Sequence, residues 1–246
     1  MNMKKKSAME STQALPGASV PSETAEITAG TLLGIRAVLI RPEEPFVLTS
    51  GRASPVYVDC RRIISFPRAR DRLMELAIET LERAAGAEAF DVVAGGETAG
   101  IPFAAWIAER LDLPMIYVRK KPKGFGRNAQ IEGTFEEGAR VLLVEDLATD
   151  GGSKLNFIEA IRQAGGEIAH CFVIFHYGIF PQGAAALGEA GVALHALATW
   201  WDVLQVAEDR GELAEQAAQE VRAFLEDPDG WSAAHGGKTG AEAGGG

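Results

Sequence analysis

The stretch Val141-Leu142-Leu143-Val144-Glu145-Asp146-Leu147-Ala148-Thr149-Asp150-Gly151-Gly152-Ser153 decides the fold of this 246-residue chain. Its four leading apolar residues predict a buried strand, because a short apolar run bounded by polar residues is typical of a strand covered on both faces. Two acids stand at the exposed end of that strand, and a small-residue loop leads directly into a helix. Strand, loop and helix in this order predict one unit of a parallel α/β sheet.

Helical patterns alternate with short apolar runs on both sides of this stretch. A hairpin is predicted over residues 45–60, with its turn at Ser50-Gly51-Arg52. The alternation predicts an α/β fold with a mostly parallel central sheet flanked by helices, whose ligands gather at the carboxyl ends of the strands. Helices are predicted near 25–40, 67–85, 98–111, 153–164 and 211–225, and strands at 90–94, 115–118, 140–144, 168–175 and 193–196.

Composition divides the chain into four parts. Residues 1–24 are rich in Ser, Thr, Pro, Ala and Gly and predict a disordered tail. Residues 25–65 contain the first helix and the hairpin, and residues 66–228 form the core, with a mobile loop at 120–133. Residues 229–246 end in a glycine run and predict a second disordered tail. We expect neither tail to carry catalysis.

Bulk properties exclude several classes of protein. A net charge of −10 and a pI near 5.0 argue against a nucleic-acid partner, because such modules usually carry a basic surface. The two cysteines, Cys60 and Cys171, lie in apolar runs and predict packed, reduced thiols rather than a disulfide framework or a metal cluster. No apolar stretch is long enough to span a membrane. We therefore expect a cytoplasmic protein with no membrane partner.

The loop after the acids predicts a phosphate site. Free backbone N–H groups at a helix start, with the helix dipole behind them, bind a phosphate dianion without a lysine. Thr149 and Ser153 can add hydroxyl donors, and Gly151 and Gly152 allow close approach of the backbone. Paired acids here would suit ribose hydroxyls, with Mg²⁺ nearby. The alternative is a strand end with two solvated acids and a capping turn.

A cationic segment follows the strand predicted at 115–118. Five cations fall within residues 119–127 of an otherwise acidic chain, on a Gly-rich loop. A cluster of this kind is unusual for a surface segment whose only role is to be solvated. It predicts a lid that closes over a pyrophosphate.

The strand with two acids and a small-residue loop resembles the signature of the type I phosphoribosyltransferases. The resemblance implies that the loop grips the 5-phosphate of phosphoribosyl pyrophosphate (PRPP) and that Glu145 and Asp146 hold its ribose hydroxyls. Lys120, Lys123 and Asp146 are then the expected catalytic residues, with Mg²⁺ carried mainly by PRPP and no protein metal ligand. The expected PRPP-binding residues are Arg119, Lys120, Lys123, Glu145, Asp146, Leu147, Ala148, Thr149, Asp150, Gly151, Gly152 and Ser153.

Three further segments resemble orotate phosphoribosyltransferases. Residues 46–59 are similar to the family's Ser-Gly-x-x-Ser-Pro hairpin, which forms a small N-terminal hood over the base. The resemblance implies that Ser50, Gly51, Arg52 and Thr149 bind orotate. Residues 119–133 are similar to the family loop that crosses a homodimer interface into the neighbouring site. Residues 94–102 resemble the loop on the pyrophosphate side, although an ordinary strand-to-helix turn would look alike.

In the signature, Ala148 is small and Asp150 is an uncommon choice, and the orotate-specific segments depart from the family pattern at three further places. Phe125 stands where the loop usually has histidine. Thr49 replaces a lysine of one branch, and the segment Ile174-Phe175-His176-Tyr177 lacks the orotate-binding arginine of that branch, so the pattern is closer to the Bacillus-type branch. The orotate carboxylate could be neutralised by Arg52, Arg61 or backbone amides.

These resemblances together imply an orotate phosphoribosyltransferase, a pentosyltransferase of pyrimidine nucleotide synthesis. Two alternatives stay open at this stage. One is a phosphoribosyltransferase for another base, which would share the phosphate loop but not the hairpin. The other is a non-catalytic regulator that senses PRPP on the same fold.

Overall fold

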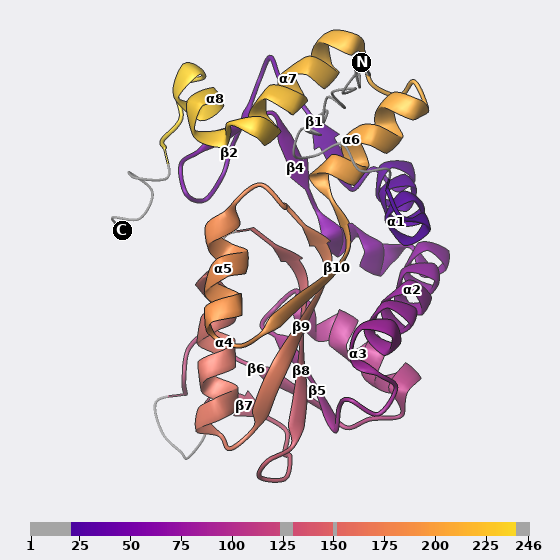
Figure 1. Ribbon diagram of the computed structural model, residues 1–246, viewed down its shortest axis with the longest axis vertical. Helices are drawn as coiled ribbons and strands as arrows, with labels where there is room; N and C mark the ends of the chain where they lie inside the picture. The colour runs from indigo at the N-terminus through magenta and orange to yellow at the C-terminus, as the bar shows by residue number, and fades with distance from the viewer. Residues whose placement is uncertain (1–20, 124–129, 150–151, 240–246) are drawn as a thin grey trace, which may run out of the picture.

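The computed structural model describes residues 21–123, 130–149 and 152–239; the side chains of residues 152 and 153 lie outside that description. Its centre is a six-stranded sheet in the order β10-β9-β8-β5-β6-β7. Strands β10, β9, β8, β5 and β6 are parallel, and β7 is antiparallel to β6 (Figure 1). The strands are β5 (Val92–Gly96), β6 (Met115–Val118), β7 (Ile131–Glu132), β8 (Arg140–Ala148), β9 (Glu167–His176) and β10 (Ala193–Thr199).

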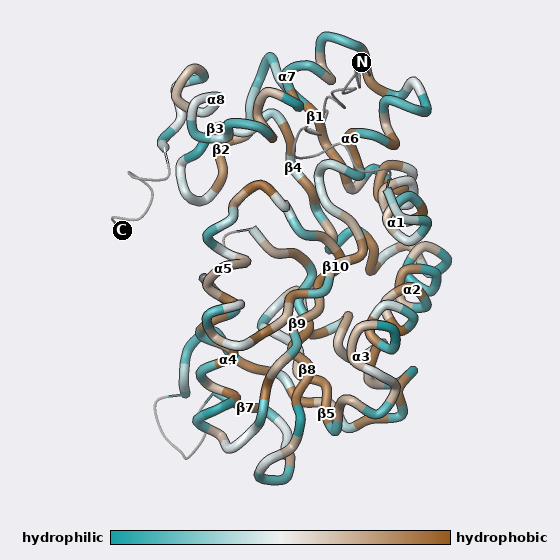
Figure 2. The backbone as a smooth tube through the Cα atoms, viewed as in Figure 1, coloured by the Kyte–Doolittle hydropathy of each residue, from teal (hydrophilic) through white to brown (hydrophobic). Residues whose placement is uncertain are grey.

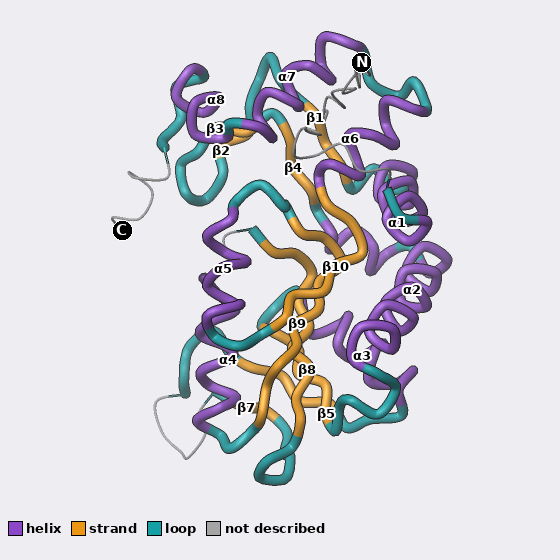
Figure 3. The backbone as a smooth tube through the Cα atoms, viewed as in Figure 1, coloured by secondary structure: helices purple, strands orange, loops and turns teal. Residues whose placement is uncertain are grey.

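Helices cover both faces of this sheet, as the parallel arrangement requires. Helices α4 (Gly152–Gln163) and α5 (Pro181–Glu189) lie on one face, and α2 (Pro67–Ala85) and α3 (Gly100–Leu111) lie on the other (Figure 3). The apolar strand residues in the middle of the molecule form the hydrophobic band seen in Figure 2. The predicted α/β class is therefore confirmed.

A second group of elements sits above the carboxyl ends of the strands; we call it the hood lobe. It contains two small antiparallel sheets, β1 (Val38–Ile40) with β4 (Val56–Val58) and β2 (Phe46–Val47) with β3 (Ala53–Ser54). Helices α6 (Trp200–Asp209), α7 (Glu215–Glu226) and α8 (Pro228–Ala234) complete it (Figure 1). Residues 38–58 and 200–234 thus build the hood lobe together, whereas the sequence indicated residues 25–65 alone.

The first predicted helix is too long at its carboxyl end. Helix α1 spans Glu23–Gly34, and Val38 and Leu39 lie in strand β1 instead. The chain leaves the helix through Arg36, whose φ of 56° is left-handed. Val38 then pairs with Val58, so a contact across 20 residues overrides the local helical pattern.

The predicted hairpin turn is confirmed. Gly51 has a φ of 84° and donates its N–H to the carbonyl of Leu48 at 2.7 Å, which closes the turn between β2 and β3. Strand β4 follows but pairs with β1, and the short 3₁₀ helix η1 (Cys60–Ser65) leads from it into α2.

The predicted carboxyl-terminal tail is wrong for residues 229–239. Asp227 caps α8 by accepting the N–H of Gly230, and Trp231 and Ser232 are buried against the hood lobe. This helix is too short for a periodic pattern, and its order comes from tertiary contacts. Helices α5 and α6 were also not predicted. The predicted amino-terminal tail of residues 1–24 is also too long, because Ser22 caps α1 and the helix begins at Glu23. Residues 1–20 and 240–246, on which the rest of the tail predictions fall, lie outside the described residues.

Two cysteines and a tryptophan are buried in the core. Cys60 and Cys171 are free and buried, as predicted. Burial raises the pKa of the Cys171 thiol to about 12, so it remains protonated. Trp200 is fully buried in the core. Among the described residues, no helix has the length and apolar character needed to cross a membrane.

Candidate active site

The two acids lie inside strand β8, which runs four residues further than predicted and ends at Ala148. Both Glu145 and Asp146 are only 8% exposed. Because neighbouring residues of a strand point to opposite faces, the two carboxylates serve opposite sides of the sheet edge. The alternative of two solvated acids at a strand end is therefore wrong.

Glu145 is held without a full set of hydrogen bonds. A side chain on Gly96 or Gly100 would overlap the carboxylate of Glu145. The absence of side chains at these two positions therefore leaves room for that carboxylate. Its Oε1 atom is buried and has no hydrogen-bond partner among the described residues. Burial raises the pKa of Glu145 to about 7; Lys154 and Lys120 oppose the rise, and the charge of Asp146 adds to it.

Asp146 faces the side of the hood lobe. Burial raises its pKa, while hydrogen bonding to the backbone N–H of Leu147 and the charges of Lys154 and Arg61 act in the opposite direction. The strand therefore presents two carboxylates whose charges are costly to maintain without a ligand.

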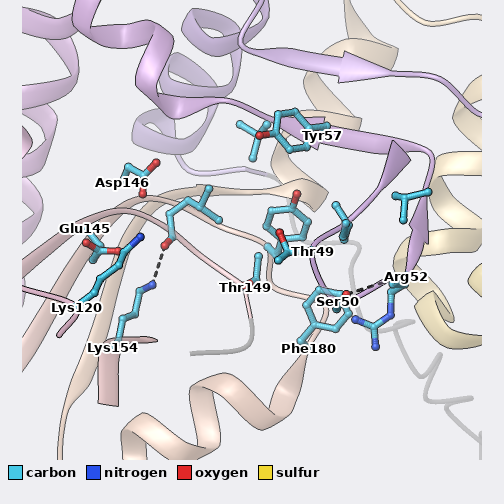
Figure 4. Close-up of a pocket in the computed structure, with 15 residues that line it drawn as sticks. Thr49, Ser50, Arg52, Tyr57, Lys120, Glu145, Asp146, Thr149, Lys154 and Phe180 are labelled. Atoms are coloured by element: carbon cyan, nitrogen blue, oxygen red, sulfur yellow. Dashed lines mark hydrogen bonds between the residues drawn. The ribbon is translucent and has the colours of Figure 1, made fainter. Parts of the chain in front are cut away.

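Lys154 is a site residue that the sequence analysis missed. It lies in the first turn of α4, is 3% exposed, and donates from Nζ to the carbonyl of Leu147 at 2.8 Å (Figure 4). The helix dipole disfavours a cation in the first turn of a helix. A lysine directly after a predicted anion loop was the signal that could have drawn attention to it.

A first cavity of about 680 Å³ opens between the acids and the hood lobe. Figure 4 shows Lys120 and Lys154 beside Glu145, with Ser50, Arg52 and Phe180 on the opposite side of the cavity. Its walls combine the hairpin turn, strand β4, the end of β8 and the segment after β9. The lining residues are Val47, Leu48, Thr49, Ser50, Arg52, Tyr57, Val58, Lys120, Glu145, Asp146, Leu147, Thr149, Lys154, Tyr177 and Phe180.

The aromatic residues of this wall were also missed. Tyr177 stacks on Phe180 with ring centroids 6.1 Å apart, and burial raises the pKa of the Tyr177 phenol. The guanidinium of Arg52 lies 4.5 Å from the centre of the Phe180 ring. A flat apolar wall with one cation at its edge suits a planar anionic ring.

A second cavity of about 530 Å³ lies on the other side of the acids. The loop between β5 and α3 forms its wall, and Glu97 of that loop accepts the backbone N–H of Lys120 at 2.8 Å. The two cavities share Lys120, Glu145 and Asp146. The other lining residues of the second cavity are Arg61, Ile64, Glu97, Thr98, Ala99, Pro102 and Phe157.

The cationic segment divides into two parts. Lys120 reaches both cavities, whereas Lys123 forms an ion pair with Glu132 of β7 and Arg119 lies 3.6 Å from the same carboxylate. These pairs lower the pKa of Glu132, with Lys123 as the largest cause. Lys123 therefore does not point into the cavities in this arrangement. Phe125 and the rest of residues 124–129 lie outside the described residues.

Most predicted site residues come together at this edge of the sheet. Ser50, Arg52 and Thr149 line the first cavity with the acids. Gly51 forms the turn behind it, and Ala148 is buried at the strand end, where its carbonyl accepts the N–H of Tyr177. Gly152 begins α4. Asp150, Gly151 and the side chain of Ser153 lie outside the described residues.

The donor set indicates how a divalent ion would be held. No group of three or more His, Cys, Asp or Glu side chains within the described ranges could enclose a metal. Two adjacent carboxylates, one with an oxygen atom that has no hydrogen-bond partner among the described residues, suit a hydrated Mg²⁺ ion. Such an ion would enter the site already bound to a diphosphate. The residues present therefore fit a metal bound mainly by its substrate.

Known proteins share this arrangement. A model described as "Phosphoribosyl transferase domain" matches residues 63–181. The orotate phosphoribosyltransferase of Dinoroseobacter shibae is 59% identical over 214 residues, which cover 87% of this chain and 95% of that protein. The crystal structure of orotate phosphoribosyltransferase from Aeropyrum pernix superposes with a TM-score of 0.64 and 34% identity, covering 76% of this chain and 99% of that one.

A further crystal structure shows a related protein with a ligand. Orotate phosphoribosyltransferase of Mycobacterium tuberculosis H37Rv, in complex with 5-phospho-α-D-ribosyl 1-diphosphate, superposes with a TM-score of 0.54 and 26% identity. The match covers 72% of this chain and 98% of that one.

An acid pair at the end of a central parallel strand, followed by a loop into a helix, defines the class: this is a phosphoribosyltransferase domain on a type I fold. Identity of nearly 60% over most of both chains then narrows the class. The chain belongs to the orotate phosphoribosyltransferase family, whose members are pentosyltransferases.

Proposed function

We propose that this enzyme transfers the ribose 5-phosphate of PRPP to N1 of orotate, giving orotidine 5′-monophosphate and pyrophosphate. One observation carries the proposal: Glu145, Asp146 and Lys120 lie between two cavities, one under the hairpin and one beside the loop at 97–102. A ribose held at the acids would have its base in the first cavity and its diphosphate in the second. The names of the related proteins support the same substrates.

The proposed roles follow from charge. Ser50, Gly51, Arg52 and Thr149 contact orotate, and Leu147 to Ser153 grip the 5-phosphate. N1 of orotate bonds to the anomeric carbon and releases its proton as the bond to pyrophosphate breaks. Positive charge grows on the ribose beside Glu145 and Asp146, and Lys120, with Arg119 and Lys123, stabilises the leaving group.

The catalytic set in this proposal is Lys120, Lys123 and Asp146. Because Lys123 faces Glu132 within its own chain, we propose that the active enzyme is a homodimer in which the 120–133 loop supplies Lys123 to the neighbouring site. Mg²⁺ bound to PRPP would neutralise part of the diphosphate charge. Buried, unpaired cysteines suit a cytoplasmic location.

The direct test is pyrophosphate release from purified enzyme with orotate, PRPP and Mg²⁺. We expect pyrophosphate release only when all three are present. Enzyme treated with EDTA should release pyrophosphate only after Mg²⁺ is added back. Adenine, hypoxanthine and uracil serve as competing bases. Faster turnover with any of them than with orotate would reject the proposal.

A further inference from the structure

The segment after α7 lies directly on the hairpin turn of the first cavity. The backbone N–H of Ala53 donates to Oγ of Ser232 at 2.9 Å, and that hydroxyl donates to the carbonyl of Lys238 at 2.7 Å. The N–H of Lys238 donates to the carbonyl of Gly51 at 2.9 Å. Two hydrogen-bonded links therefore join residues 53 and 51 to residues 179 and 187 positions later in the chain.

Shape complements these hydrogen bonds. A side chain at Gly51 would collide with the stem of Lys238, and a side chain at Gly237 would collide with the backbone of Ala53. Ser232 is fully buried between them. The turn and the carboxyl-terminal segment are in contact along their backbones, which leaves little freedom for the turn.

Arg52, at the end of this turn, is held on two sides. Its Nε and Nη2 atoms donate to Oδ1 of Asp229 at 3.0 and 2.6 Å, and its guanidinium stacks over Phe180. The Arg52 side chain is 12% exposed although the Asp229 side chain is 51% exposed. Asp229 thus occupies one edge of the guanidinium and leaves the Nη1 edge for another partner.

We infer that Asp229 is a positioning residue for Arg52 and that the segment Asp229–Lys238 is a structural part of the base site. This role rests on the proposed function, in which Arg52 binds the carboxylate of orotate. Among the cations that line the first cavity, Lys120 and Lys154 stand beside the acids, and Arg52 is the one that the hairpin contributes. A guanidinium already oriented and partly desolvated binds a planar carboxylate at lower entropic cost.

The first test compares Asp229→Ala with wild type in steady-state assays. We expect the KM for orotate to rise about five- to tenfold while the KM for PRPP and kcat stay within about twofold, because orientation of one side chain affects only the ligand that it binds. Asp229→Glu should recover part of the loss. An unchanged orotate KM would show that Arg52 is oriented without Asp229, and a lowered one would show that Asp229 competes with the base; either result rejects the inference.

Glu208→Ala is the matched control. Glu208 forms an ion pair with Arg222 at 2.8 Å within the same lobe, between α6 and α7, away from the hairpin. We expect both KM values to match wild type. An equal rise of the orotate KM in this variant would indicate general loosening of the lobe rather than positioning of Arg52.

Truncation tests the segment itself. A chain ending at Thr239 keeps the described contacts, whereas a chain ending at Gly237 loses both hydrogen bonds of Lys238. Only the shorter chain should show a raised orotate KM, and melting curves check that both fold. Equal KM values in two folded chains would reject the role of the segment. Wild-type turnover is measured first: no turnover with orotate rejects the proposed function, whereas normal turnover with unaffected variants rejects this inference alone.

Discussion

At the scale of single residues, the site is built at the expense of local stability. Glu145 is buried with one oxygen unpaired, and its pKa is raised to about 7, mainly by desolvation. A carboxylic acid with a raised pKa in the folded state stabilises the protein below its unfolded pKa, and that contribution is lost as pH rises through the folded value. Ionisation of Glu145 above that pH therefore opposes folding, and we assign the charge to ligand binding.

Glu145→Gln tests this conclusion. At pH 8, wild type carries the buried charge and the variant does not, so we expect the free energy of unfolding of the variant to be about 2 kcal/mol higher. Near pH 4, where Glu145 is protonated, we expect the two free energies of unfolding to be equal. Urea titrations at the two pH values measure the difference. Turnover should fall at the same time, because the ribose loses an ionic partner. A variant less stable than wild type at pH 8 would contradict the argument.

Lys154→Met removes the cation beside the same acids. The buried carbonyl of Leu147 loses its donor, and we expect the free energy of unfolding to fall by about 2 kcal/mol at pH 8. The double variant Lys154→Met, Glu145→Gln should have a higher free energy of unfolding than the sum of the two single changes predicts. The reason is that a neutral residue at 145 no longer needs the charge of Lys154. Lys121→Met, at an exposed position, is the control and should leave stability unchanged. Strict additivity would show that Lys154 and Glu145 are not coupled.

At the scale of elements, local patterns predicted the sheet well and its partners less well. The apolar run of β8 and the Gly51 turn are properties of adjacent residues, and both are present as expected. The pairing of β4 with β1 and the order of α8 depend on residues far apart in the sequence. Pairing of residues 145–148 with β9 also made β8 longer than its apolar run.

Strands β9 and β10 are joined by a histidine pair that is sensitive to pH. Nδ1 of His170 lies 2.9 Å from Nε2 of His195, so one ring donates and the other accepts. Burial, followed by the charge of His170, lowers the pKa of His195. A histidine with a lowered folded pKa gives full stability above the unfolded value near 6.5, and this is lost as pH falls below it.

We therefore expect His195→Gln to gain several degrees of melting temperature relative to wild type as pH falls from 7.5 to 5.5, because a neutral amide does not titrate. Protonation of Glu145 over the same range affects both proteins equally and cancels in this difference. Differential scanning fluorimetry across this range measures both proteins. Parallel pH curves for the two proteins would show that His195 does not contribute to the pH dependence of stability.

At the scale of the whole molecule, the site is assembled from a sheet edge and a lobe made by two segments far apart in the sequence, residues 38–58 and 200–234. The proposed homodimer adds a third component, the loop that carries Lys123. In the single chain, Lys123 pairs with Glu132, and Lys120 alone of the two reaches the cavities.

Lys123→Ala should lower kcat far more than it raises either KM, since its charge is needed only as pyrophosphate leaves. Mixing it with Asp146→Asn tests the dimer. If the loop serves the neighbouring site, each mixed dimer has one intact site, and an equal mixture should regain about a quarter of wild-type activity. Activity no greater than the mean of the two separate variants would place Lys123 in its own chain's site.

The acid pair, the alternation of strands and helices and the turn at Gly51 were readable along the chain, because each depends on the spacing of neighbouring residues. The partners of Lys154, Arg52 and Lys123, and the packing of residues 229–239 on the hairpin, were not. Each of these contacts joins side chains or backbone groups whose meeting depends on how the elements pack. Charge and hydropathy patterns specify which face of an element is buried, and only the folded chain specifies what that face contacts.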